Sequence, residues 1–414
     1  MRYLRGFGLK IFLLTSPNFS SVRGNSDLDS VLNRLPPLLQ DSDIAYFSSR
    51  YDLDGVHWAL VNVFARSDRN PDGSQAKFTL PEALAARGAG NSYTSASKVA
   101  HDLEQANYLL EHSSSMKKET RVQLENVIIP TLKRLKKHIP PLEELFETRG
   151  LYKFKRKDYN LLGILNVYNK AFHVPEFTHI EDFTLSQSFH QQTEFFEDEW
   201  IHSDQPGILI IDDLLSQSAL KNVQKIMMES TVFYQNGGGF VGAHVDDGLH
   251  QKILLAVAYE LNKSLPQIFK GHDFKYLKAL KYDSEYPEVS SATINDAAVT
   301  VTLWVTPEEA NLDPETGGLI VFTSKPSSDW DFDTNHMNPE RVIKDILEPS
   351  NYANVTIPYK MNRAAIYDSS FFSRTDKFTF KTGYENRRID LTFLYGDFQK
   401  VCDSPTCANG FDLK

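Results

Sequence analysis

The sequence predicts an α+β protein in which a helical N-terminal region precedes an antiparallel sandwich or jelly roll with flanking helices. Apolar residues recur at helical spacing between residues 95 and 138. From Val299 to Val305 apolar and polar residues alternate, and short strand-like runs divided by turns continue to Tyr395. Because 414 residues are long for one core, we expect two domains.

The composition is that of a globular protein. Formal net charge is −10, which argues against a broad nucleic-acid surface, and no segment holds the roughly 20 apolar residues of a membrane span. The two cysteines, Cys402 and Cys407, lie in the tail, so no cysteine-rich metal site is expected. Two free thiols in a reducing compartment are favoured over one small disulfide loop.

The N-terminus has the composition of an organelle transit peptide. No acidic residue precedes Asp27, whereas Arg2, Arg5, Lys10 and Arg23 alternate with apolar residues and serines. A mitochondrial or plastid location is one interpretation, and a basic arm of a cytoplasmic protein is the other. We treat residues 1–94 as an extension used for targeting or partner binding, and expect Met1 to about Gly90 to become ordered only in a complex.

Residues 95–206 are predicted to be mainly helical, with a connector. One amphipathic helix carries Val99, Leu103, Ala106 and Leu110, and we expect this apolar face to pack against the β-domain. A second runs from about Met116 to His138, interrupted by Pro130. Its basic C-terminal end fits a solvated face better than a binding patch; these residues are Lys133, Arg134, Lys136 and Lys137. A third helix is expected over Tyr159 to Ala171 and a connector over Val174 to Asp204; the helices are too few for a repeat array.

Residues 207–398 are predicted to form the β-rich domain, followed by a tail over 399–414. Ile208 to Ile211 is a short strand, and a helix follows with Leu220, Val223, Ile226 and Met227 on one face. Another helix is expected at about Gln251 to Asn262. The remaining strands are predicted at Val299 to Val305, which should be half-buried, Leu319 to Phe322 after the Gly317-Gly318 turn, Asn354 to Ile357, Arg363 to Tyr367 and Arg388 to Tyr395.

Several motifs resemble a family of iron(II)/2-oxoglutarate-oxygenase-like proteins. The longest match runs from Ala297 to Pro307 and continues through Glu309 to Pro314 and Gly317-Gly318-Leu319. Further matching groups are Pro358-Tyr359, Asn362-Arg363-Ala364, Thr375-Asp376, Gly383 to Arg388, Lys281 to Ser284, Gly242-Ala243 and, weakly, His101 to Gln105. The resemblance covers most of the chain from about residue 95.

The resemblance implies a double-stranded β-helix with a His-X-Asp pair and a later histidine as iron ligands. At those positions this chain has Thr293, Asn295 and Ser373. Neutral hydroxyl and amide groups supply no charge to offset Fe²⁺, so we predict a degenerate site without metal. Asp296 could approach the site only through a one-residue slip, which would reverse its face of the strand.

Other candidate ligands are weaker. His244-Val245-Asp246 and His202-Ser203-Asp204 have His-X-Asp spacing, but both lie upstream of the matched core.

Arg387 and Arg388 fall where the resemblance implies a pocket for 2-oxoglutarate. The alternative is an arginine held by a structural partner such as Asp368 or Asp390.

Three functions follow. The first is a non-catalytic oxygenase-fold protein, a structural or interaction subunit of a protein assembly, for which peripheral membrane contact is left open. The second is an active iron(II)/2-oxoglutarate-dependent hydroxylase with an atypical site built on His244, Asp246 or Asp296. The third is a dicarboxylate sensor that binds at Arg388 without turnover. Only the second requires iron as a cofactor.

Overall fold

The structure is a computed structural model that describes residues 93–141, 144–145, 151–155, 157–158, 167–169, 171–175, 183–237, 239–245, 249, 251–286, 291–327, 330 and 338–398. The chain divides into two compact units. The first takes in residues up to 180 with 222–256 and 278–286, and the second takes in 181–221, 257–277 and 287 onward. The domain boundaries expected at 94, 206 and 398 remain predictions.

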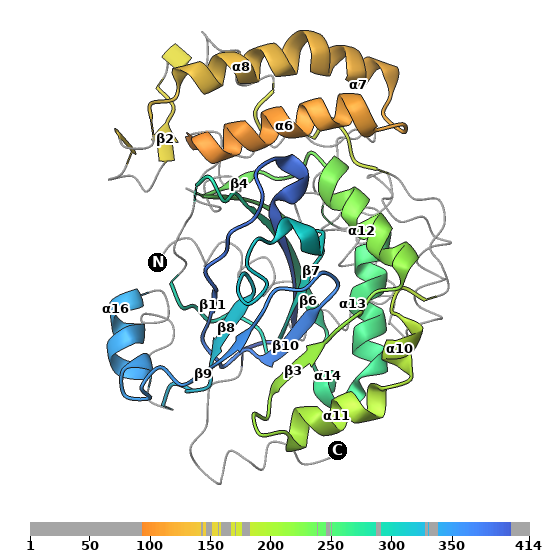
Figure 1. The fold of residues 1–414 in the computed structure, drawn as a ribbon, viewed down its shortest axis with the longest axis vertical. Coiled ribbons are helices and arrows are strands. Elements are labelled where there is room, and N and C mark those ends of the chain that lie inside the picture. Colours follow the sequence, from red (N-terminus) through yellow and green to blue (C-terminus); the bar gives the residue numbers. More distant parts are fainter. Residues whose placement is uncertain are drawn as a thin grey trace, which may run out of the picture. The chain divides into compact units, whose positions relative to one another are not determined.

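A large antiparallel sheet is the central element, as the sequence predicts for its C-terminal half (Figure 1). Its order is β3-β10-β7-β12-β6-β5-β4. The pairs from β3 to β12 are antiparallel, as are those from β6 to β4. The strands are β3 (Ile208–Ile211), β4 (Gln235–Asn236), β5 (Phe240–His244), β6 (Phe274–Tyr282), β7 (Val299–Trp304), β10 (Ala364–Asp368) and β12 (Arg388–Tyr395).

A second sheet has three antiparallel strands, ordered β11-β8-β9. They are β8 (Leu319–Phe322), β9 (Asn354–Ile357) and β11 (Ser373–Thr375). Leu319 and Val321 belong to a core shared with Trp304, Ala365 and Tyr367 of the large sheet. The mixture of helices with a large antiparallel sheet is consistent with a jelly-roll fold.

One strand differs from its prediction. The alternation in β7 predicts a half-buried strand, but the face with Thr300, Thr302 and Trp304 is as buried as the face with Val301 and Leu303. The polar-looking face lines the interior between the two sheets, where hydroxyls can be satisfied by one another. The alternating threonines of β7 therefore indicate a strand face that is buried in the protein interior, not one that is exposed to solvent.

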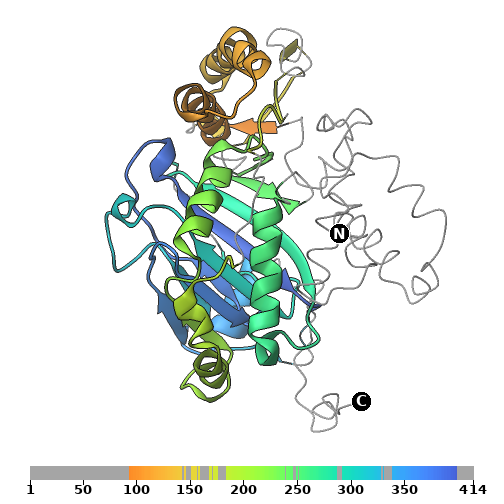
Figure 2. The same ribbon diagram turned by 90° about the vertical axis from the view of Figure 1, so that its right-hand side faces the viewer.

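The first unit contains a helical hairpin, coloured orange in Figures 1 and 2. Helix α6 (Ala96–His112) is capped by the Ser95 hydroxyl, which accepts from the backbone N–H of Lys98. The return segment consists of α7 (Lys118–Gln123), a π-helical turn η3 (Leu124–Ile128) and α8 (Ile129–His138). The interruption predicted at Pro130 is confirmed, because a π-helical turn directly precedes α8, in which this proline is the second residue.

The apolar face of α6 was expected to pack against the β-domain, but it packs against the return segment of the hairpin. Val99 contacts a cluster with Leu135 of α8, and Leu103 and Leu110 pack against a second cluster that includes α8. These side chains therefore build the hairpin. Polar groups on α6 reach the other elements of the unit instead: Gln105 donates to the carbonyl oxygens of Met228 and Ser230 at 3.2 and 2.9 Å.

A buried charged cluster joins α6 to β6. Lys281 Nζ lies 3.3 Å from His101 Nε2 and 3.9 Å from the centre of the Phe233 ring. His101 Nδ1 lies 3.0 Å from a carboxylate oxygen of Asp102, which also pairs with Lys98. Burial raises the pKa of Asp102, but Lys98 and His101 outweigh it, so the pKa is lowered overall. This cluster is a structural link between helix and strand.

Further elements complete the units. The predicted connector at 174–204 contains two helices, α10 (Gln187–His190) and α11 (Thr193–His202). The helices predicted after β3 and near Gln251 are α12 (Gln217–Glu229) and α13 (Lys252–Ser264). The remaining short elements are β1 (Tyr93–Ser95), β2 (Leu151–Lys153), α14 (Pro266–Phe269), η7 (Glu308–Ala310), α16 (Pro339–Val342), η8 (Ile343–Leu347) and η9 (Tyr384–Asn386).

Some of the predictions concern residues that the structure does not describe. The N-terminal extension, Cys402, Cys407 and most of the helix expected at Tyr159 to Ala171 lie outside the described residues. The basic residues at the end of α8 are exposed, as expected for a solvated face. Within the described segments, no helix combines the length and apolarity needed to cross a bilayer.

Candidate functional site

Two of the three positions marked by the resemblance are direct neighbours. Thr293 and Ser373 form an antiparallel bridge: the Thr293 N–H donates to the Ser373 carbonyl at 2.9 Å, and the Ser373 N–H donates back at 2.8 Å. The Thr293 side chain is exposed, whereas Ser373 is buried. Residues 80 positions apart are thereby held together at the end of the small sheet.

The third position, Asn295, reaches Ser373 through a tyrosine. Asn295 Nδ2 donates to the Tyr367 hydroxyl at 3.4 Å, and the Tyr367 hydroxyl lies 3.1 Å from Ser373 Oγ. Asn295 Nδ2 also donates to Thr300 Oγ1 at 3.3 Å, which in turn lies 2.7 Å from Ser369 Oγ. Burial raises the pKa of Tyr367, so the phenol stays protonated. The result is a neutral network of hydroxyl groups and one amide.

These residues do not fit an iron(II) ion. Carboxylate and imidazole are the donors that hold iron in a facial triad. Here the nearby side-chain donors are neutral hydroxyls and an amide that already bond one another, and none supplies negative charge.

Asp296 does not supply the missing charge. Its carboxylate is 75% exposed and lies 3.3 Å from Lys275 Nζ, which also donates to the Asp296 carbonyl. Asn295 contacts the buried network instead, so the neighbouring residue points to the other face. A one-residue slip therefore does not bring Asp296 to this site.

The upstream His-X-Asp triplets have other local partners. His244 Nε2 lies 2.7 Å from the Gln235 side-chain oxygen, and Asp246 lies outside the described residues. His202 pairs on the surface with Asp198, four residues earlier on α11, at 2.8 Å. Across the part of the chain that is described, no three His, Cys, Asp or Glu side chains are grouped so as to hold a metal ion.

Arg388 has a structural partner. Its side chain is fully buried, and Nη2 donates to Asp390 at 2.8 Å and to the Gly318 carbonyl at 3.1 Å. The guanidinium also lies 5.4 Å from the centre of the Phe378 ring. Of the two partners considered from the sequence, Asp390 is the one found, because Asp368 pairs with Lys325.

Arg387, the other residue expected in the pocket, is buried as well. Its backbone carbonyl accepts from the Thr306 hydroxyl at 2.7 Å. The same hydroxyl accepts from the backbone N–H of Ile389 at 3.0 Å. The start of β12 is thereby fixed from both sides of Arg388.

One residue of this region was missed from the sequence. Tyr367 is predicted only as the end of a strand, whereas the pairing of an arginine with Asp390 is one of the alternatives given above and is found at Arg388. The sequence carries a signal for the ion pair, because Arg388 and Asp390 are two residues apart and share one face of β12. Polar residues two apart on interior strands are the pattern to look for.

Comparison with known proteins gives similarities among solved structures alone. No family model matches the chain, and no curated protein matches it. The α-ketoglutarate-dependent epimerase SnoN of nogalamycin biosynthesis is similar over 50% of this chain and 81% of its own, at 15% identity and a TM-score of 0.33. The carbocyclase SnoK of the same biosynthesis is similar over 54% and 90%, at 10% identity and a TM-score of 0.34. A prolyl-4-hydroxylase from Pseudomonas putida is similar over 50% and 99%, at 12% identity and a TM-score of 0.32.

Proposed function

We propose that this chain is a non-catalytic oxygenase-fold protein that serves as a structural or interaction subunit of a larger assembly. One observation carries the proposal: Asn295 and Ser373, two of the positions where the resemblance implies metal ligands, are bridged by the buried hydroxyl of Tyr367. The basic, acid-free composition before Asp27 favours an organelle as the place of that assembly.

The physical argument concerns the cost of binding a dication there. Iron would have to replace hydrogen bonds among Asn295, Tyr367 and Ser373 and would be held by neutral oxygens in a buried place. A buried charge that is not offset by opposite charge is strongly unfavourable. The arrangement therefore favours a role for the fold's shape over metal chemistry.

Exposed apolar side chains support an interaction role. In the second unit, Phe183 is 58% exposed, Phe195 of α11 is 56% exposed and Ile201 of the same helix is 44% exposed. Large apolar groups that remain in water are the residues that partner proteins cover.

The dicarboxylate-sensor alternative has less support. A ligand carboxylate at Arg388 would have to compete with Asp390, which already offsets the guanidinium charge at 2.8 Å inside the protein. Such a ligand would leave the Asp390 carboxylate buried without its arginine, which is costly.

The test is an anaerobic titration of the full chain with Fe(II), with and without 2-oxoglutarate. We expect no stoichiometric iron, no turnover and no 2-oxoglutarate binding. The variant Thr293→His/Asn295→Asp/Ser373→His/Tyr367→Phe restores the implied ligands and removes the competing hydroxyl, so it should gain iron binding. The matched control, Thr293→Ala/Asn295→Ala/Ser373→Ala/Tyr367→Phe, should not.

Two results would contradict the proposal. One iron per wild-type chain with turnover of 2-oxoglutarate would establish the active hydroxylase. Binding of 2-oxoglutarate without iron, abolished by Arg388→Met, would establish the sensor.

A further inference from the structure

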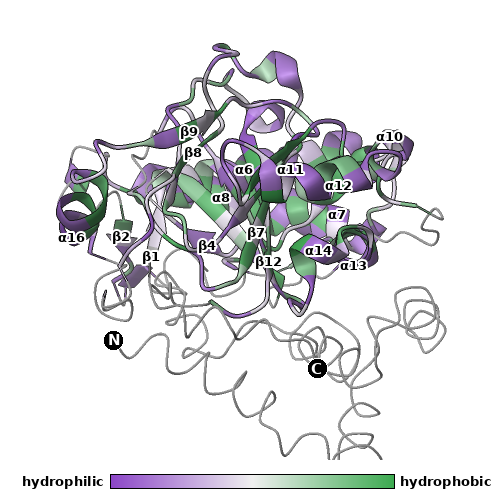
Figure 3. Cartoon of the chain, turned by 90° about the horizontal axis from the view of Figure 1, so that it is seen from below, coloured by the Kyte–Doolittle hydropathy of each residue, from purple (hydrophilic) through white to green (hydrophobic). Residues whose placement is uncertain are grey.

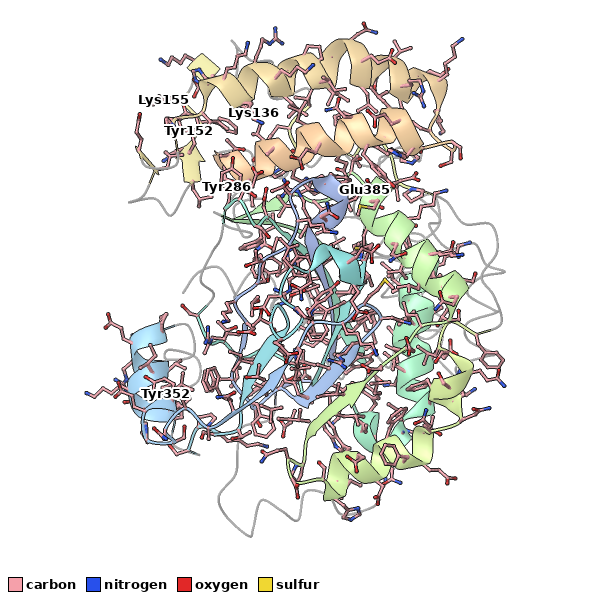
Figure 4. All side chains as sticks on the ribbon, viewed as in Figure 1. Lys136, Tyr152, Lys155, Tyr286, Tyr352 and Glu385 are labelled. Atoms are coloured by element: carbon pink, nitrogen blue, oxygen red, sulfur yellow. The ribbon has the colours of Figure 1, made fainter. Side chains whose placement is uncertain are left out.

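A pocket of about 350 Å³ lies in the second unit, on the small sheet and away from the network around Tyr367. It is bounded by β8, β9 and β11 on one side and by α16 and η8 on the other. Its walls are mostly apolar, and Tyr352 lies beside α16 (Figure 4). The lining residues are Ser291, Ala292, Ile320, Phe322, Pro339, Val342, Ile343, Leu347, Tyr352, Asn354 and Arg374.

Strand alternation separates this pocket from the proposed metal-free site. Leu319 and Val321 of β8 face the core that contains Tyr367, whereas Ile320 and Phe322 belong to a second core with Val342 and Leu347. In β11, Ser373 contacts Tyr367, and the next residue, Arg374, lines the pocket. The two sites therefore use opposite faces of the same small sheet.

Arg374 is the charged group of the pocket. It is half-buried, and its side chain forms none of the hydrogen bonds or ion pairs found among the described residues. By contrast, Arg341 and Arg363 of this unit are paired with carboxylates, Arg341 with Asp345 and Arg363 with Asp212. A guanidinium partly removed from water beside apolar walls is stabilised by an anionic partner, which it can bind through two parallel hydrogen bonds.

The shape and chemistry limit the ligand. At roughly 30 Å³ for each water-sized group, the volume holds a body of about a dozen heavy atoms. Apolar residues on both sides favour hydrocarbon for that body, and α16 with η8 presents hydrophobic and hydrophilic residues next to each other (Figure 3). The polar end of the ligand should be a single carboxylate at Arg374.

We propose that this pocket binds a small amphipathic carboxylate, such as a medium-chain fatty acid. The carboxylate pairs with Arg374, and the chain lies between Ile320 and Phe322 on the sheet and Val342 and Leu347 on the helical side. This proposal goes beyond the proposed function and is independent of it, because it uses none of Asn295, Tyr367 or Ser373.

The experiment titrates the full chain with decanoate, decanol and acetate by calorimetry. Tryptophan fluorescence gives a second readout, because Trp330, one of the four tryptophans, packs against the same apolar cluster; its contribution is the part of the signal that is absent in Trp330→Phe. We expect decanoate to bind, decanol to bind about 10- to 100-fold more weakly because it lacks the charge-assisted hydrogen bonds, and acetate to give no signal. Arg374→Gln should reduce decanoate affinity to that of decanol.

Two control variants make the result specific. Arg341→Gln removes an arginine of α16 that is paired with Asp345 and lies outside the pocket lining, so it should leave decanoate affinity unchanged. Ile343→Trp fills the pocket from a side chain that is already 40% exposed, so it should abolish binding without disturbing the core. Equal affinities for decanoate and decanol, an unchanged affinity in Arg374→Gln, or no decanoate binding at millimolar concentration would each overturn the proposal. Iron titration of the same samples tests the proposed function separately.

Discussion

At the scale of single residues, the interior of the second unit is organised by buried polar pairs. Arg388 and Asp390 are two residues apart on β12 and form a buried ion pair at 2.8 Å. Tyr359 donates from its hydroxyl to the Thr306 carbonyl at 2.6 Å, and burial raises the pKa of this phenol. Such pairs specify which strand positions face inward, because a misplaced partner leaves a buried polar group unsatisfied.

The ion pair gives a prediction about stability. Asp390→Asn leaves the Arg388 charge buried without its counter-charge and should lower the free energy of unfolding by about 3–5 kcal/mol. Arg388→Met/Asp390→Leu removes both charges and should recover most of that loss. Urea denaturation measures both variants. If the double variant is no more stable than the single one, the pair is held by more than its charges.

At the scale of elements, the sequence located most helices and strands because their periodicity is strong. Strands β3, β8, β9, β10 and β12 lie within one residue of their predicted bounds, and α6 contains the four apolar positions predicted for the first helix. Strands β5 and β6 were missed. The β6 run Phe274–Tyr282 carries lysines at 275, 278 and 281, and Lys281 lies on the buried side beside Phe233. A buried lysine breaks the alternation on which strand prediction depends.

The positions that form the candidate site were predictable, but the hydrogen bonds among their side chains were not. The family resemblance implies that Thr293 and Ser373 lie together, and their backbone bridge agrees with this. The role of Tyr367 depends on two strands meeting across the interior, which no local pattern encodes. The pocket at Arg374 likewise needs β11 to face α16, a contact set only by the packing of the whole unit.

Gly318 gives a prediction for the small sheet. A Cβ atom at this position would lie 1.9 Å from the Ile357 carbonyl oxygen, so β8 and β9 can approach only at a glycine. Gly318→Ala should destabilise the second unit by about 3 kcal/mol or more, because backbone must move. Gly271→Ala is the control, since its φ of +75° is strained for alanine but the space around it is open. We expect that loss to be about 1–2 kcal/mol by the same urea measurement. Similar losses for both variants would show that the small sheet can shift freely.

At the scale of the whole molecule, the two units differ in how many of their described carboxylates have a lowered pKa. The first unit pairs three carboxylates with histidines: Asp102 with His101, Asp158 with His138, and Glu229 with His173. In the second unit Asp212 pairs with Arg363 and Lys360, and hydrogen bonding to Arg363 is the main cause that lowers its pKa. Among the described residues, three carboxylates with a lowered pKa therefore lie in the first unit and one, Asp212, lies in the second.

Acid should consequently unfold the first unit before the second. Burial alone would raise the pKa values of Asp158 and Glu229, but hydrogen bonds outweigh burial and lower both, as the cluster around Asp102 does for that residue. A carboxylate with a lowered pKa in the folded state stabilises the fold above its unfolded pKa of about 4. That stabilisation is lost as pH falls through the lower folded value, so the sensitive range lies below about pH 4.

Hydrogen exchange between pH 6 and 2.5 should show α6 and α8 losing protection before β7 and β12. Asp158→Asn should flatten the pH dependence of the first unit while leaving that of the second unchanged, because Asp158 accepts hydrogen bonds from Tyr152 and His138 within the first unit. Simultaneous loss of protection in both units at one pH would mean that they unfold as a single cooperative body.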